Sequence, residues 1–244
     1  MKNNIIILNI ILLILIIVIT IYYLSIYLKR NIKETFELNI PKYVISLKKR
    51  QERREHIIRE FTDKNIKNWQ FFDAYEPSAE DMKKYPGKKK GKIGVTTSHI
   101  LVWEKCIELD KPIFIFEDDI YFDNYRNEDI KILMNNINLW DIAWFGHCYE
   151  ESVEKTDKII GNFYKSFKPK CRHAYLLTPK GAQILLDNIN FDSNGDEQMG
   201  KLIYDNKIKS LSLYPTTIKQ SWQMKNTKIF KSDSVVESFI NYFK

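Results

Sequence analysis

An uncharged apolar run near the amino terminus constrains this chain more than any other feature. It covers residues 5–28 and reads IIILNIILLILIIVITIYYLSIYL, 24 residues without a charged side chain. A helix needs about 20 apolar residues to cross a bilayer. Three tyrosines gather toward the carboxyl end of the run and Lys29-Arg30 close it, as is typical where a helix meets lipid headgroups. The run predicts one membrane-spanning helix in contact with the lipid bilayer.

We expect this segment to be retained as a signal anchor. A cleaved signal peptide has a shorter apolar centre followed by small residues, whereas residues 1–40 contain neither Ala nor Gly. The predicted organisation is a tail at residues 1–4, the anchor at 5–28, a polar stem at 29–38 and one domain of ordinary size at 39–244. The length and all-round apolarity of the run disfavour a buried core helix.

The charge balance argues against a nucleic-acid partner. The chain carries a formal charge of +7, and three of the positive charges flank the apolar run. The small remaining excess is spread over the chain, with one lysine-rich stretch at residues 83–92, and no nucleic acid is expected as a partner. Hydrophobic residues make up 44% of the chain and charged residues 28%, which is typical of a globular protein.

After Pro41 the sequence alternates between short β-rich runs and stretches with helical spacing. Strands are expected at 43–47, 68–74, 113–119, 140–146 and 174–178, and helices at 50–61, at 93–109 and from Pro179 onward, behind the hydroxyl cap Thr178. The lysine-rich stretch between the second strand and the second helix is expected to be a loop. This alternation predicts an α/β fold with a mainly parallel sheet.

The strand PIFIFEDD ends in three adjacent carboxylates, Glu117, Asp118 and Asp119. Open α/β sheets bind ligands at the carboxyl ends of their strands. Alternation along the strand places Glu117 and Asp119 on one side and Asp118 on the other. Two carboxylates on one side suit Mg²⁺ or Mn²⁺, which prefer oxygen ligands and often share them with substrate phosphates. A solvated loop or a helix start is the alternative interpretation.

Four separated stretches resemble glycosyltransferase family 25, which includes lipooligosaccharide and procollagen galactosyltransferases. In the family's order, they are YVISLKKRQERR, GKIGVTTSHILVWEKC, PIFIFEDD and AYLLTPKGAQILL followed by Asp196. The later pieces GHCYE, CRHAY, YPTTIKQ and SDS resemble a eukaryotic and viral branch. Two positions depart from the family pattern: the acidic motif begins with Glu rather than Asp, and His173 stands where many members have a small or hydroxyl residue.

The resemblance implies a GT-A, Rossmann-like nucleotide-diphospho-sugar transferase domain. It implies inverting transfer of a hexose, galactose or glucose, from a UDP-sugar to a glycan, lipid-linked or protein acceptor. The metal, Mn²⁺ or Mg²⁺, would be held by Glu117 and Asp119 with Asp118 beside them, and would neutralise charge on the departing nucleotide. The alternative is an inactive GT-A-like module that binds glycans or partners behind the same anchor.

Five residues are candidates for donor binding. Leu47 ends the first strand, and Arg50 and Arg53 follow it, where guanidinium groups can bind phosphate with two hydrogen bonds. A solvated helix face is the alternative for the arginines. Ser98 and His99 match the family's Ser-His pair and are candidates for a donor-site hydrogen bond, although a lone helical histidine is more often a satisfied structural residue.

Inversion requires a base outside the metal site, and Asp196 is the candidate, with Glu197 as the fallback. Asp196 follows the AYLLTPKGAQILL helix and matches the family's acidic position. It also precedes another helical stretch, so an N-cap role is the alternative.

His147 and His173 flank Cys148 and Cys171, and three arrangements are open for them. These are a zinc site, a disulfide and two buried thiols, of which the zinc site has the least support because the cysteines lack Cys-x₂-Cys spacing. Cys106 is expected to be a core thiol.

Two arguments point to opposite orientations in the membrane. Lys2 precedes the span while Lys29, Arg30 and Lys33 follow it, which favours a cytoplasmic domain. The family resemblance implies a lumenal catalytic domain of a single-pass protein in an ER/Golgi-type or viral or host membrane.

Overall fold

The computed structural model describes residues 2–38, 40–148 and 156–223. The chain divides into two compact units, Met1–Asn39 and Ile40–Lys244. The SDS motif at residues 232–234 lies outside the described residues, as do the last two residues of the GHCYE motif.

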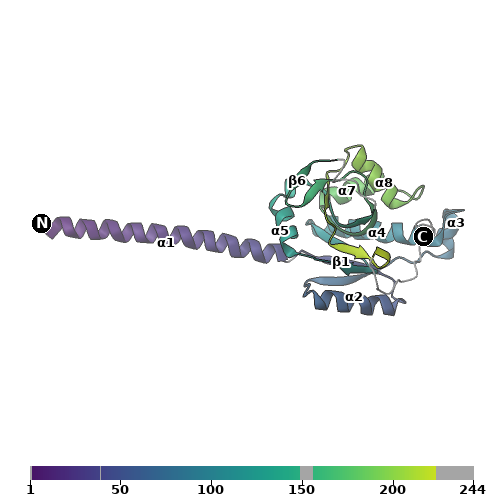
Figure 1. Cartoon of the computed structure of the whole chain (residues 1–244), viewed down its shortest axis with the longest axis horizontal. Coiled ribbons are helices and arrows are strands. Elements are labelled where there is room, and N and C mark those ends of the chain that lie inside the picture. The colour runs from purple at the N-terminus through teal and green to yellow at the C-terminus, as the bar shows by residue number, and fades with distance from the viewer. Residues whose placement is uncertain (1, 39, 149–155, 224–244) are drawn as a thin grey trace. The chain divides into compact units, whose positions relative to one another are not determined.

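The first unit is one helix, α1 (Lys2–Leu38). Within it Ile10–Leu28 forms a segment of 19 residues with a mean hydropathy of 2.8, and none of its side chains is buried by protein. This segment is long and apolar enough to cross a membrane, as an anchor or as a signal sequence. The helix continues through the polar stem (Figure 1).

The second unit alternates helices and strands. Its helices are α2 (Gln51–Asp63), α3 (Ala79–Lys84), α4 (Lys90–Leu109), α5 (Asn127–Asn135), η1 (Ile137–Leu139), α7 (Pro179–Asn188), α8 (Gly195–Tyr204) and η2 (Ser221–Gln223). Its strands are β1 (Lys42–Ser46), β2 (Trp69–Asp73), β3 (Ile113–Glu117), β4 (Ile120–Phe122), β5 (Ile142–Cys148), β6 (Lys158–Ile160), β7 (Phe163–Lys165), β8 (Lys170–Leu177), β9 (Ser210–Leu213) and β10 (Ile218–Gln220).

The central sheet has the strand order β2-β1-β3-β8-β5-β9-β7-β6 and is mixed. β1 pairs in parallel with β2 and β3, and β5 with β9, whereas β8 runs antiparallel to both β3 and β5. The predicted α/β class is confirmed and the mainly parallel sheet is wrong. A parallel crossover needs a helix or a similarly long connection, and the described part of the chain between β5 and β8 holds the short antiparallel pair β6–β7 instead.

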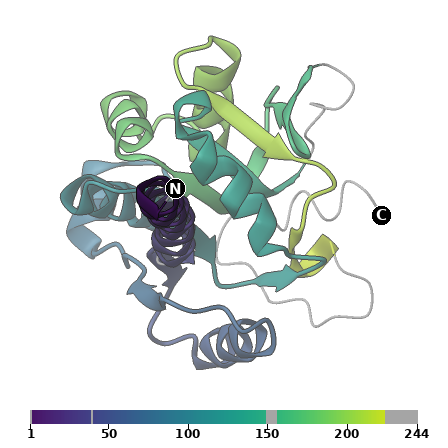
Figure 2. The same cartoon turned by 90° about the vertical axis from the view of Figure 1, so that its left-hand side faces the viewer.

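Each face of the sheet is buried against its own layer (Figures 1 and 2). Phe114 and Phe116 of β3 pack with residues of α2, α5 and the two-stranded sheet β4–β10, while Ile113 and Ile115 pack with residues of α4, α7 and α8. Side chains of a strand alternate between the two faces, so an apolar strand buried on both sides carries its end into the interior of the layered domain.

Two local signals decide where helices begin. Thr178 caps α7 as predicted, because its hydroxyl accepts a hydrogen bond from the Gly181 amide at 3.0 Å, with proline at the first helical position. The expected loop between β2 and the next helix is wrong in part. It contains α3, which begins with a capping box of Ser78 and Asp81, and α4 begins at Lys90, three residues before the predicted start.

Candidate active site

The acidic turn, defined as Glu117, Asp118 and Asp119, lies at the end of β3, where Asp118 is buried and Glu117 and Asp119 are partly exposed. Nε2 of Gln220 lies 3.1 Å from Oε2 of Glu117 and 3.4 Å from Oδ1 of Asp119, which places these two carboxylates on one side. Asp118 points to the other side, where it accepts hydrogen bonds of 2.7 Å from the Ser46 hydroxyl and from Nη1 of Arg53. Glu117 and Asp119 therefore share a side, as the sequence predicts, although β3 ends at Glu117 and the turn that follows it, not strand alternation, places Asp118 and Asp119.

The arginine that follows β1 contacts the acidic turn itself. Arg53 is buried on α2, and its Nη1 also lies 3.8 Å from Oδ2 of Asp119. It therefore fixes the turn and supplies one positive charge to it. Arg50 stands at the N-cap position of α2 and is partly exposed, and Leu47 is the partly exposed residue directly beyond β1. All three residues follow β1 in the chain, and their role in donor binding stays a prediction.

The charge on Asp119 is poorly compensated. Burial raises its pKa first, and the nearby carboxylates of Glu117 and Asp118 raise it further, while Arg53 and Gln220 oppose them. The resulting pKa is about 7. A carboxyl group with so high a pKa indicates a site that accepts either a proton or a cation.

Glu117 is held by a chain of hydrogen bonds through the core. Nε1 of Trp103 donates to the hydroxyl of Tyr175 at 2.8 Å, that hydroxyl donates to Nδ1 of His99 at 2.8 Å, and Nε2 of His99 faces Oε1 of Glu117 at 3.4 Å. Burial, followed by the charge of Arg172, lowers the pKa of His99 to about 4, so its imidazole is neutral near pH 7. Burial alone would raise the pKa of Glu117, and the His99 hydrogen bond with the His173 and Arg172 charges brings it below its usual value.

Ser98 lies in the same helix, α4, with a different set of contacts. Its hydroxyl donates to the Gly94 carbonyl at 2.7 Å and accepts from the Tyr75 amide at 2.8 Å. Both Ser98 and His99 are buried, and they therefore contact the interior of the domain. The contacts of His99 reach the acidic turn, and those of Ser98 tie α4 to the segment after β2.

Asp196 lies in the first turn of α8. Its Oδ2 accepts a hydrogen bond of 3.3 Å from the Cys171 amide and its Oδ1 accepts one of 3.1 Å from the Glu197 amide. The N-cap of α8 is Asn194, so the alternative assignment of Asp196 as the N-cap is wrong. The helix begins earlier than expected because Gly195 already has a helical conformation. Glu197 is exposed and accepts from the Asn194 side chain at 3.2 Å.

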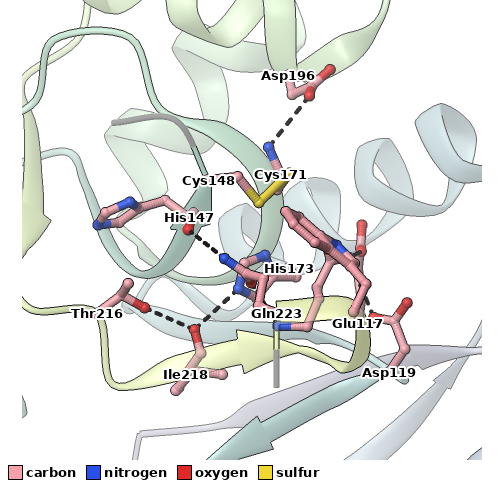
Figure 3. The surroundings of a disulfide bond; sticks show 12 residues. Glu117, Asp119, His147, Cys148, Cys171, His173, Asp196, Thr216, Ile218 and Gln223 are labelled. Atoms are coloured by element: carbon pink, nitrogen blue, oxygen red, sulfur yellow. Dashed lines mark hydrogen bonds between the residues drawn. A yellow bond between two sulfur atoms is a disulfide. The ribbon is translucent and has the colours of Figure 1, made fainter. Parts of the chain in front are cut away.

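A disulfide joins the end of β5 to β8 beside the carboxylate of Asp196 (Figure 3). Cys148 and Cys171 are paired with Cα atoms 5.5 Å apart, which confirms the disulfide among the three arrangements left open by the sequence. The zinc alternative is wrong, because Nε2 of His147 bonds the Leu213 carbonyl and both thiols are consumed. Cys106 is free and buried, as predicted.

Sequence reasoning missed two residues of this region, Gln220 and Arg172. Gln220 bridges Glu117 and Asp119, and Nε1 of Trp222 donates to its Oε1 at 3.0 Å. Arg172 is buried, and its charge acts on both His99 and Glu117. Both residues fall inside motifs quoted above, YPTTIKQ and CRHAY, but no spacing rule assigns a role to either.

The acidic turn fits a divalent cation held together with substrate oxygens. Within the described residues no group of three His, Cys, Asp or Glu side chains forms a ready-made metal cage. Glu117 and Asp119 offer hard oxygen ligands on one side, and burial and the neighbouring carboxylates raise the pKa of Asp119, so a bound cation would stabilise its charged form. Mg²⁺ and similar ions commonly bind to one or two carboxylates plus substrate phosphates, so the donor set fits.

Comparison with known proteins identifies the family. The model of glycosyltransferase family 25, described as an LPS biosynthesis protein family, matches residues 39–173, which includes the acidic turn and the disulfide. The chain belongs to glycosyltransferase family 25. That membership confirms the resemblance found in the sequence motifs and supports glycosyl transfer as the chemistry.

Similar proteins occur in bacteria and in animals. The lipooligosaccharide biosynthesis protein lic2B of Haemophilus influenzae is 36% identical over 155 residues, covering 59% of this chain and 53% of that protein. A glycosyltransferase 25 family member of Aedes aegypti is 26% identical over 199 residues, covering 67% and 32%. Procollagen galactosyltransferase 1-A of Xenopus laevis is 25% identical over 169 residues, covering 59% and 28%. This chain thus spans about half of lic2B and about a third or less of the animal proteins.

Proposed function

We propose that this protein is a membrane-anchored hexosyltransferase. It transfers galactose or glucose, with inversion, from a UDP-sugar to a glycan, lipid-linked or protein acceptor. The observation that carries the proposal is the acidic turn in a family 25 domain, where Glu117 and Asp119 share one side of the strand end and the charge of Asp119 lacks compensation.

The acidic turn is the place for the donor diphosphate. A bound Mn²⁺ or Mg²⁺ would supply Lewis-acid stabilisation of the departing nucleotide. Glu117 and Asp119 would hold that cation, while Asp118 and Arg53 form the buried ion pair that keeps the turn in place. Arg50 and Leu47, at the edge beyond β1, contact the nucleotide portion of the donor.

The neutral His99 positions Glu117 rather than contacting the sugar. It presents an N–H to Oε1 of Glu117 because the Tyr175 hydroxyl occupies its other ring nitrogen. A metal-binding side chain that a second residue already holds in place loses less conformational freedom when it binds a cation. His99 is therefore a positioning residue in the proposed mechanism.

Asp196 accepts the proton of the attacking acceptor hydroxyl. Inversion requires a base on the face of the sugar opposite the leaving group. Asp196 is partly exposed, is not part of the acidic turn, and is aimed by amide hydrogen bonds from Cys171 and Glu197. Hydrogen bonds from backbone amides fix its orientation, and Glu197 remains the fallback base.

α1 holds the catalytic unit at a membrane. The 19-residue apolar segment of α1 supports an anchor, and the disulfide supports an oxidising, lumenal or extracellular setting for the domain. We place the protein in an ER/Golgi-type or viral or host membrane with the catalytic unit lumenal. The charge count around the span predicts the opposite orientation, and the disulfide is the stronger argument because cytosolic thiols are kept reduced.

A donor screen tests the proposal. Full-length protein in detergent is incubated with a panel of UDP-sugars, with and without Mn²⁺, and release of UDP and formation of a glycosylated product are measured. Metal-dependent turnover of UDP-galactose or UDP-glucose is the expected result. Binding of glycans without turnover of any donor would instead favour the inactive binding module.

A further inference from the structure

Among the residues that the structure describes, Arg172 has no partner that accounts for its burial. It is only 6% exposed, its Nη2 makes one long hydrogen bond of 3.5 Å to the Thr96 hydroxyl, and within residues 40–148 and 156–223 its Nη1 has no hydrogen-bond partner. Among the described residues no carboxylate forms an ion pair with it. A buried charge without a partner costs several kcal/mol in general, so such a group is uncommon unless it binds something.

An irregularity in β8 turns Arg172 toward the helices. Ala174 pairs with Gly146 and Lys170 pairs with Cys148, so β8 has two more residues across this interval than β5. Cys171 has a φ of 58°, in the left-handed region that non-glycine residues rarely adopt. Bulges of this kind re-aim side chains next to functional sites, and here the disulfide fixes the bulge.

The guanidinium meets the amino-terminal end of α8. A Cβ added at Gly195, the first residue of that helix, would overlap Nη1 of Arg172 and lie 2.6 Å from its Cζ, so glycine leaves the space that the guanidinium fills. The side chain of the cap residue Asn194 bonds the Glu197 carboxylate and makes no cap hydrogen bond to the backbone amides of the helix. The positive end of the helix dipole and a buried guanidinium therefore converge, an arrangement that favours an anion.

We propose that Arg172, Thr96 and the first turn of α8 form an oxyanion subsite that takes a phosphate or carboxylate group of a substrate. The two carboxylates in the first turn of α8 have other partners: Asp196 bonds the amides of Cys171 and Glu197, and Glu197 bonds Asn194. Two parallel N–H bonds from one guanidinium match the geometry of either oxyanion.

The position of the subsite favours the acceptor as the source of the oxyanion. The guanidinium of Arg172 lies against Gly195, next to Asp196, the base of the proposed function, and its charge also reaches Glu117 of the acidic turn. The assignment to an acceptor rests on the proposed function, and the existence of the subsite does not. An acceptor that carries a phosphate or carboxylate near its reactive hydroxyl fits this arrangement.

Inorganic phosphate is the probe for the subsite. The melting temperature of the full-length protein in detergent, without metal, is measured against phosphate concentration, with sodium chloride at matched ionic strength as the blank. We expect a saturable rise for wild type that Arg172→Met abolishes. Arg59→Met, which removes an exposed arginine and the same charge, is the matched control and should keep the rise.

The same variant separates a ligand-binding arginine from a structural one. Arg172→Met removes an unpaired buried charge, so its melting temperature without phosphate should equal or exceed that of wild type. If Arg172→Met does not fold, Arg172→Lys replaces it. Lysine keeps the charge but loses the two parallel N–H groups of the guanidinium, so the apparent dissociation constant for phosphate should rise about tenfold or more. No phosphate effect in wild type, or equal effects in wild type and the Arg172 variant, would overturn the proposal.

Saturating UDP distinguishes the two sources of the oxyanion. Persistence of the phosphate effect in UDP-saturated protein assigns the subsite to the acceptor, which is the expected result. Loss of the effect under UDP assigns it to the donor diphosphate. If wild type does not bind UDP at all, the proposed function fails, and the comparison of Arg172→Met with wild type in phosphate alone still decides the subsite.

Discussion

At the scale of single residues, Asp119 links the electrostatics of the acidic turn to its chemistry. Asp119→Asn keeps the shape of the side chain and removes the charge that would hold a cation. We expect turnover to fall by about a hundredfold or more, with the fold retained. The measurement is UDP release under saturating donor and metal. Asp187→Asn, on the exposed side of α7, is the control.

Asp119→Asn should also change how the free energy of unfolding depends on pH. The folded pKa of Asp119, about 7, is above its ordinary value of 3.8, so the folded state binds this proton more tightly than the unfolded state. The contribution of Asp119 to stability is therefore present at low pH and is lost as pH rises from about 4 to 7. Asp119→Asn should lack this loss in urea unfolding at pH 5 and pH 7.5. Wild-type turnover in this variant would contradict the metal assignment.

Asp196 and Glu197 are adjacent carboxylates, and substituting each of them in turn distinguishes their roles. Asp196→Asn should lower kcat by a factor of about 10² to 10⁴, because an amide cannot accept the proton, while its oxygen can still accept the Cys171 amide. Asn194 is the N-cap, so the melting temperature should change little. Glu197→Gln is the matched control. A loss of kcat in Glu197→Gln alone would move the base to Glu197.

At the scale of elements, the disulfide holds the ends of β5 and β8 together beside Asp196. Replacing both Cys148 and Cys171 by serine should lower the free energy of unfolding by about 2–4 kcal/mol. It should also reduce kcat, because the Cys171 amide that orients Asp196 belongs to the bulge. Dithiothreitol should reproduce both effects in wild type and change nothing in the double variant. Cys106→Ser is the control for the free thiol, and unchanged kcat in the double variant would refute the positioning role.

His147, on the same strand, makes β5 sensitive to acid. Burial lowers its pKa to about 4, below the ordinary 6.5, and the Leu213 carbonyl accepts its Nε2 proton at 3.0 Å. The unfolded state therefore binds this proton more readily, so stability is present above pH 6.5 and is lost as pH falls toward 4. His147→Gln should reduce the acid loss between pH 7.5 and 5 by on the order of 2 kcal/mol in urea unfolding. An identical pH dependence in both proteins would show that His147 is not responsible.

At the scale of the whole molecule, the anchor and the catalytic unit should be separable. Residues 40–244 form a compact unit, and removal of residues 1–38 should release the protein from membranes while leaving its melting temperature unchanged. In sealed microsomes we expect a carboxyl-terminal tag on the full chain to resist protease until detergent is added. Digestion of the tag without detergent would place the catalytic unit on the cytoplasmic side and agree with the charge count around the span.

The sequence by itself determined the features that depend on neighbours in the chain. Hydropathy predicted the apolar helix, and the Thr178-Pro179 pair predicted the start of α7. Motif order indicated the family. These properties follow from local geometry and composition, which the linear sequence carries directly.

Only the tertiary structure decided the features that join distant segments. The antiparallel course of β8 places Cys171 and Arg172 beside α8 and the end of β5, and the bulge reverses the side on which a simple alternation would place them. Likewise, Gln220 reaches Glu117 across 103 positions of sequence. Long-range pairing depends on how whole elements bury their apolar faces and satisfy their backbone groups together, and no local pattern in the sequence encodes that outcome.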